Sequence, residues 1–86
     1  MFRNSKQKKI KINLTDYEHA IEFIQLTNQY DANFDIRQNR MFVDGKSLLG
    51  VLSLDLSKDI FLYLDNDFDE KVFEKFKRWE RISFSS

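Results

Sequence analysis

Residues 43–60 read VDGKSLLGVLSLDLSKDI, and this stretch decides how the rest of the chain is arranged. Asp44-Gly45 is a turn pair, because glycine tolerates a positive φ and aspartate can bond to its own local backbone. Ser47 precedes an apolar run and can cap the start of a helix with its hydroxyl oxygen. The run is apolar on nearly every side, whereas a helix of one or two turns buries only one stripe. Part of the run must therefore face something other than the core of its own domain.

The run from Lys46 to Leu54, KSLLGVLSL, closely resembles the regulatory-serine segment of HPr, the histidine-containing phosphocarrier family of the bacterial sugar phosphotransferase system. An ungapped alignment extends back over Tyr30 to Arg40 and forward from Asp59 to about Trp79, where the agreement is mainly in pattern and length. The resemblance implies an α+β fold, the HPr-like open-faced β-sandwich. Its four-stranded antiparallel sheet would have the strand order 1-4-2-3.

Hydrophobic periodicity predicts the element order β-α-β-β-α-β-α. Thr15 to Glu18 fits a capping box at the start of the first helix, whose buried row is Ala20, Ile24 and Thr27. In this order all three helices must cover one face of the antiparallel sheet. The expected strands are Lys8 to Leu14, Phe34 to Arg37, Met41 to Val43 and Ile60 to Leu64, and the expected helices are Asp16 to about Gln29, the short run after Ser47, and Asp69 to about Glu80.

Length and composition indicate one small domain, residues 8–84, after a flexible basic arm at 1–7. The net charge of zero argues against a nucleic-acid partner, and no apolar run approaches the roughly 18 residues of a membrane span. Without cysteines or a signal-peptide pattern, we expect a cytoplasmic protein. Without a glycine-rich phosphate loop or a histidine and cysteine cluster, we expect no cofactor and no metal.

The resemblance places the phosphocarrier histidine of the family at the start of the first helix, where free N–H groups and the helix dipole favour a phosphoryl group. In the ungapped alignment Asp16 occupies that histidine's position and Glu18 that of the neighbouring arginine. Two carboxylates repel a phosphoryl group, so we expect a protein that is neither an enzyme nor competent for histidine phosphorelay.

The remaining groups at this helix start have several interpretations. Asp16 is a helix-capping acid, or a permanent mimic of a phosphorylated histidine. His19 has no partner in the sequence and is interpreted as a structural or surface histidine. A true phosphocarrier that uses Asp16 or His19 is the least favoured alternative.

Ser47 is interpreted either as a regulatory phosphorylation site or only as a helix cap, since the same geometry serves both. Three leucines match family positions that dock enzyme partners, and Tyr17 and Ile21 can join them in one exposed apolar patch. By family analogy the partners are a serine kinase, a transcription regulator or a phosphotransferase-system enzyme. The three leucines are Leu48, Leu49 and Leu52.

A second surface follows from strand alternation, which puts Phe42, Phe61 and Tyr63 on the sheet face away from the core. The aromatic residues suggest a homodimer stacked sheet to sheet, or a partner domain; the alternative is a tolerated cross-strand cluster. The leading hypothesis is thus a regulatory, protein-docking HPr-like module controlled at Ser47. The alternative is a constitutive dimerisation or interaction module.

Overall fold

The structure is a computed structural model that describes residues 8–65 and 69–81. Its elements follow the predicted order, although β1 ends at Ile12 rather than Leu14 and the last predicted helix divides into α3 and a final 3-10 turn, η1. The arm predicted at 1–7 lies outside the described residues, and so do Ile82 and Phe84, the two hydrophobic residues that we expect to anchor the C-terminal tail. The elements are β1 (Lys8–Ile12), α1 (Tyr17–Thr27), β2 (Phe34–Gln38), β3 (Met41–Asp44), α2 (Leu48–Leu52), β4 (Ile60–Leu64), α3 (Glu70–Phe76) and η1 (Lys77–Trp79).

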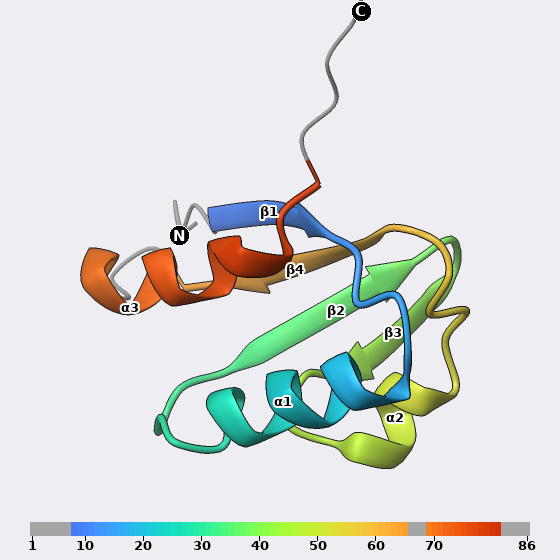
Figure 1. The fold of residues 1–86 in the computed structure, drawn as a ribbon. Coiled ribbons are helices and arrows are strands. Elements are labelled where there is room, and N and C mark those ends of the chain that lie inside the picture. The colour runs from blue at the N-terminus through green and yellow to red at the C-terminus, as the bar shows by residue number, and fades with distance from the viewer. Residues whose placement is uncertain (1–7, 66–68, 82–86) are drawn as a thin grey trace, which may run out of the picture.

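Within these described ranges the strands form one four-stranded antiparallel sheet in the order β1-β4-β2-β3. This confirms the fold class and the strand order implied by the resemblance. α1, α2 and α3 lie on one side of the sheet, so that the chain forms two layers (Figure 1). None of the helices in the described part of the chain has the length and apolar content to cross a membrane.

The core lies between the two layers. Alternate residues of β2 and β4 point into it, which gives the burial periodicity of two that a sheet covered on one face requires. Aromatic rings join the elements, with ring centres 5.8 Å apart for Phe23 and Phe76 and 5.4 Å apart for Phe34 and Phe76. The buried hydrophobic residues are Ile10, Ile12, Leu14, Ala20, Phe23, Phe34, Ile36, Val51, Leu54, Ile60, Leu62, Leu64, Phe76 and Trp79.

Two burial predictions are wrong in detail. On α1, Phe23 is fully buried and Ile24 only partly, because Phe23 enters the ring cluster formed with Phe76 and Trp79. Strand alternation puts Met41 on the core face, opposite Phe42, but Met41 is 41% exposed at the start of the edge strand β3. Its register partner Gln38 is covered instead by the loop after α2, where it exchanges two hydrogen bonds with the backbone of Asp55.

The turn at Asp44-Gly45 forms as predicted, but not for the predicted reason. The Asp44 carboxylate accepts a hydrogen bond from the Lys46 N–H at 3.0 Å, whereas Gly45 does not have a positive φ. Gly45 instead passes close to β2: a Cβ atom there would lie 2.8 Å from the Cβ of Phe34. Glycine is needed for close approach and not for backbone conformation.

Candidate functional site

The N-cap of α1 is Asp16, so the predicted capping box is wrong by one residue. Asp16 has the extended backbone of an N-cap, and its carboxylate accepts a hydrogen bond from the His19 N–H at 3.0 Å. Thr15 has φ of +64°, a left-handed conformation that is uncommon for a β-branched residue and excludes it from the cap position. Backbone strain of this kind concentrates at functional or over-determined sites.

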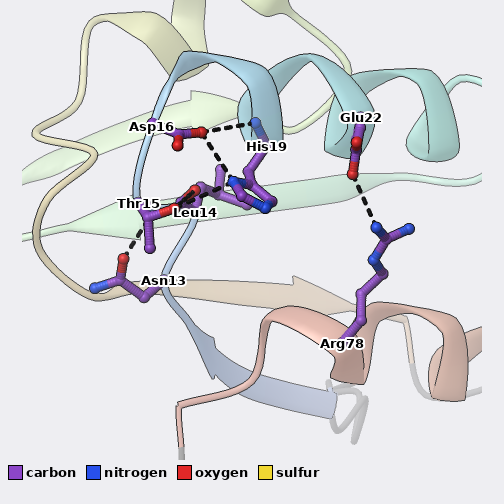
Figure 2. Close-up of polar contacts among 7 residues, drawn as sticks. All are labelled: Asn13, Leu14, Thr15, Asp16, His19, Glu22 and Arg78. Carbon is purple, nitrogen blue, oxygen red and sulfur yellow. Dashed lines mark hydrogen bonds and ion pairs between the residues drawn. The ribbon is translucent and has the colours of Figure 1, made fainter.

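The sequence suggested an isolated histidine at position 19, but in the structure the His19 ring has two polar neighbours. Its Nδ1 atom lies 2.8 Å from the Asp16 carboxylate and 3.2 Å from the Thr15 hydroxyl (Figure 2). An ionised carboxylate only accepts hydrogen bonds, so Nδ1 is the donor in this pair. The pair fixes the ring orientation next to the start of α1.

The charge at this helix start is negative. The hydrogen bond from the His19 N–H, followed by the bond to the His19 ring, lowers the pKa of Asp16 below its ordinary value. The carboxylate therefore stays ionised and uses the N–H group that an incoming phosphoryl group would need. The Glu18 side chain adds a second exposed carboxylate in the same turn.

Arg78 is paired with an acidic residue of α1 and is not available to a phosphoryl group at the helix start. Arg78 of η1 donates a hydrogen bond to Glu22 of α1 at 2.8 Å, and its guanidinium lies 4.7 Å from the centre of the Trp79 ring (Figure 2). The contact joins α1 to the C-terminal turn. The sequence did not predict it, because the two residues are 56 positions apart.

Ser47 is the N-cap of α2, as predicted. Its hydroxyl oxygen accepts a hydrogen bond from the Gly50 N–H at 3.0 Å, and its side chain is half-buried. The end of α1 holds the same turn, since Asn28 donates to the Lys46 carbonyl at 3.1 Å and Thr27 donates to the Gly45 carbonyl at 2.8 Å. The serine thus sits on a positioned backbone at a helix start.

The residues of the predicted apolar patch belong to α1 and α2, which lie next to each other in the structure. The first turn of α1 lies beside α2 (Figure 1), and Leu49 is 82% and Tyr17 55% exposed. Ile21, Leu48 and Leu52 are half-buried, and Leu52 also packs against the core. We call these five residues the α1/α2 surface.

The other predicted surface lies on the opposite side of the sheet. Phe42 is 66% exposed, while Phe61 and Tyr63 are half-buried. The guanidinium of Arg37 lies 4.8 Å from the centre of the Phe42 ring and 4.5 Å from that of Tyr63. Sequence reasoning did not assign Arg37 to this surface, although strand alternation places it beside the three aromatic residues.

We searched the described ranges for a metal site and for a ligand-binding hollow. No group of three or more histidine, cysteine, aspartate or glutamate side chains in these residues could hold a metal ion. A hollow of about 450 Å³ lies between the segment Tyr30–Asn33 and the side chains of Asp65, Asp69 and Val72. We assign no ligand to this hollow.

Element order, sheet topology and the position of α2 together define the HPr-like fold. No protein-family profile and no curated protein matches the sequence. The likeness to known proteins is therefore one of structure.

Solved structures that share this architecture include two HPr proteins and one Crh protein. The phosphocarrier protein HPr from Bacillus anthracis is 21% identical with a TM-score of 0.71, over 92% of this chain and 100% of that one. HPr-C-His from Thermoanaerobacter tengcongensis is 20% identical with a TM-score of 0.65, over 78% and 83%. The catabolite repression protein Crh from Bacillus subtilis, a dimer with a swapped domain, is 19% identical with a TM-score of 0.60, over 96% and 100%. At these identities the comparison establishes the fold, and function must be argued from the site.

Proposed function

We propose that this chain is a regulatory, protein-docking module of the bacterial cytoplasm that does not carry out histidine phosphorelay. In this proposal the α1/α2 surface binds a protein partner, and phosphorylation of Ser47 controls the binding. The observation that carries the proposal is the position of Ser47: its hydroxyl lies at the start of α2, two residues before the most exposed leucine of the surface.

The start of α1 supports the loss of phosphorelay. Asp16 places an ionised carboxylate where the family resemblance puts the histidine that accepts the phosphoryl group, and this carboxylate accepts the hydrogen bond from the His19 N–H. A phosphoryl group brought to this turn would meet the charges of Asp16 and Glu18, with Arg78 held by Glu22.

Ser47 supports the regulatory role for a different reason. Adding a phosphate replaces the hydroxyl cap with about two negative charges beside the Gly50 N–H and next to Lys46. The modified group would change both the charge and the local shape of the α1/α2 surface at its centre. A partner that packs on Leu49 would sense that change directly.

The test is intact-mass spectrometry after incubation with an HPr serine kinase and ATP. We expect one added phosphate on the native chain and none on Ser47→Ala. Ser53→Ala is the matched control, because Ser53 is an exposed serine at the other end of α2. If the native chain gains no phosphate, or if Ser47→Ala gains as much phosphate as the native chain, the proposed regulatory role of Ser47 is wrong.

A second experiment tests the absence of phosphorelay. Incubation with phosphoenolpyruvate and the general phosphotransferase enzyme should leave the chain unlabelled. An acid-labile phosphate lost in His19→Ala would instead identify a true phosphocarrier that uses His19, and would overturn this half of the proposal.

Dimerisation through Phe42, Phe61 and Tyr63 is the alternative function. The 66% exposure of Phe42 favours some occupant for this face. The cations that stack on these rings, however, are poorly suited to a dry interface between two copies, and they point to a different ligand.

A further inference from the structure

The open face of the sheet carries cations and aromatic rings in alternation. The strand registers pair Lys11 with Phe61, Phe61 with Arg37, and Arg37 with Phe42. These four side chains form one row that crosses all four strands of the described sheet, with cation and ring in turn. Lys9 and Tyr63, which also pair, lie in the adjoining row.

Two cations of this arrangement, Lys9 and Arg37, contact aromatic rings instead of carboxylates. The guanidinium of Arg37 lies between the Phe42 and Tyr63 rings, and the Lys9 ammonium lies 5.2 Å from the centre of the Phe61 ring. Among the ion pairs of residues 8–65 and 69–81, none involves Lys9, Lys11 or Arg37. A stacked guanidinium keeps its in-plane N–H donors available for a phosphate.

We infer that this open sheet face binds single-stranded nucleic acid. Bases stack on exposed aromatic rings whatever their sequence, and the backbone phosphates need nearby cations. An antiparallel sheet with aromatic residues on its open face is a general platform for single-stranded RNA. Phe42, Phe61 and Tyr63 supply the rings. The cations are Lys9, Lys11 and Arg37.

The net charge of zero does not contradict this inference, because it is an average over the molecule. On the helix side the start of α1 is acidic, whereas the row from Lys11 to Phe42 contains two cations and no acid. Asp35 and Asp44 lie opposite each other in the adjoining row, and Asp44 is engaged with the Lys46 N–H. A bound strand would therefore follow the first row.

A second copy of the chain fits the face less well. A two-fold dimer brings the same patch against itself, so Lys9, Lys11 and Arg37 would lose water against a surface with the same three cations. Within the four described strands, the acids on this face that could offset that cost are Asp35 and Asp44. A polyanion with flat bases complements both the charge and the rings.

The experiment is fluorescence anisotropy with end-labelled single strands of about ten nucleotides, the size that one such platform covers. Oligo(U) RNA, oligo(dT) DNA and a DNA duplex are titrated with the native chain at low salt. We expect both single strands to bind and the duplex to bind more weakly. With three phosphate contacts, the logarithm of the binding constant should fall with the logarithm of salt at a slope of roughly −2.

Variants of the open face make the test specific. Phe42→Ala should weaken binding about tenfold or more through loss of stacking, and Phe42→Trp should retain it. Arg37→Ala should weaken binding and reduce the salt slope by about 0.7. Lys71→Ala is the matched control: it removes one exposed cation from α3, on the helix side, and should bind like the native chain.

Several results would overturn the inference. The inference is wrong if neither single strand binds. It is also wrong if Lys71→Ala weakens binding as much as the open-face variants do, or if neither Phe42→Ala nor Arg37→Ala weakens binding. If sedimentation shows a dimer that Phe42→Ala converts to monomer, the face is a homodimer interface instead. Circular dichroism of each variant verifies its fold. We expect the fold to be retained, because Phe42, Arg37 and Lys71 are all exposed. No kinase takes part, so the result is independent of the Ser47 proposal.

Discussion

At the residue scale, the start of α1 shows how one side chain can decide what a helix terminus does. Asp16 satisfies the His19 N–H and holds the His19 ring, while Thr15 turns the chain in a left-handed conformation. A helix start that supplies its own anion has less to offer an external one. The sequence identified Asp16 as an acid at this position, but its bond to the imidazole is visible only in three dimensions.

Asp16 should make stability depend on pH. Because its pKa is lower in the folded state, its contribution is present above the pKa of the unfolded chain and is lost as pH falls through the folded pKa. Urea unfolding at pH 7 and below about pH 4 should show this loss for the native chain. Asp16→Asn keeps a capping oxygen but does not titrate, so its loss over the same range should be smaller. Equal losses in both chains would contradict the assignment.

Gly45 and Gly50 should respond differently to alanine. A Cβ at Gly45 would lie 2.8 Å from the Phe34 Cβ, in the packed core, so Gly45→Ala should cost about 1–3 kcal/mol of unfolding free energy. At Gly50 the nearest contacts are 3.3 Å, to the Ser47 Oγ and the Val43 Cβ, and the higher helix propensity of alanine offsets up to about 1 kcal/mol. Thermal or urea unfolding of both variants measures the difference, and a Gly50→Ala variant that loses more would contradict this account.

At the element scale, α2 depends on its cap and on contacts outside itself. A helix of five residues does not form alone, since isolated helices of this length are unstable in water. Val51 of this helix is buried in the core, and the side chains of Thr27 and Asn28 donate hydrogen bonds to the turn before the helix. The resemblance to the HPr family matches Val51 and Leu54 to core positions, and both are buried.

Ser47→Ala should destabilise the protein by about 0.5–2 kcal/mol, because the Gly50 N–H loses its acceptor. Ser47→Asp restores an acceptor at the same position and should recover most of that loss. Urea unfolding of the two variants measures the effect. If Ser47→Ala has native stability, the hydrogen bond does not contribute as a cap, and phosphorylation would be the remaining reason for a serine here.

At the scale of the whole molecule, the rings of Phe23, Phe34, Phe76 and Trp79 connect α1, β2, α3 and η1. A domain of 86 residues buries a limited core, so a few large rings supply much of its apolar contact. Phe76 is at the centre of the group, with ring contacts to the other three. The cluster holds the helix layer to the sheet.

Phe76→Ala should cost about 3–5 kcal/mol, a large share of the roughly 5–15 kcal/mol that stabilises a typical domain. We expect the variant to be largely unfolded at temperatures where the native chain is folded, as measured by circular dichroism. Phe73→Ala is the matched control from the same helix: Phe73 is only partly buried, so its loss should be clearly smaller. Equal losses would mean that the cluster is not the main connection between the layers.

The sequence by itself determined the order of the elements, the cap at Ser47 and the cross-strand aromatic face, because these follow from local pattern and spacing. The strand order came from resemblance to a known family. Only the tertiary structure decided which residues meet: His19 with Asp16, Arg78 with Glu22, and Arg37 between Phe42 and Tyr63. The structure also places the helix cap at Asp16, not at Thr15 of the predicted capping box, and shows that Gly45 is needed for close approach to Phe34. These contacts depend on how strands and helices pack across long sequence separations, which periodicity does not encode.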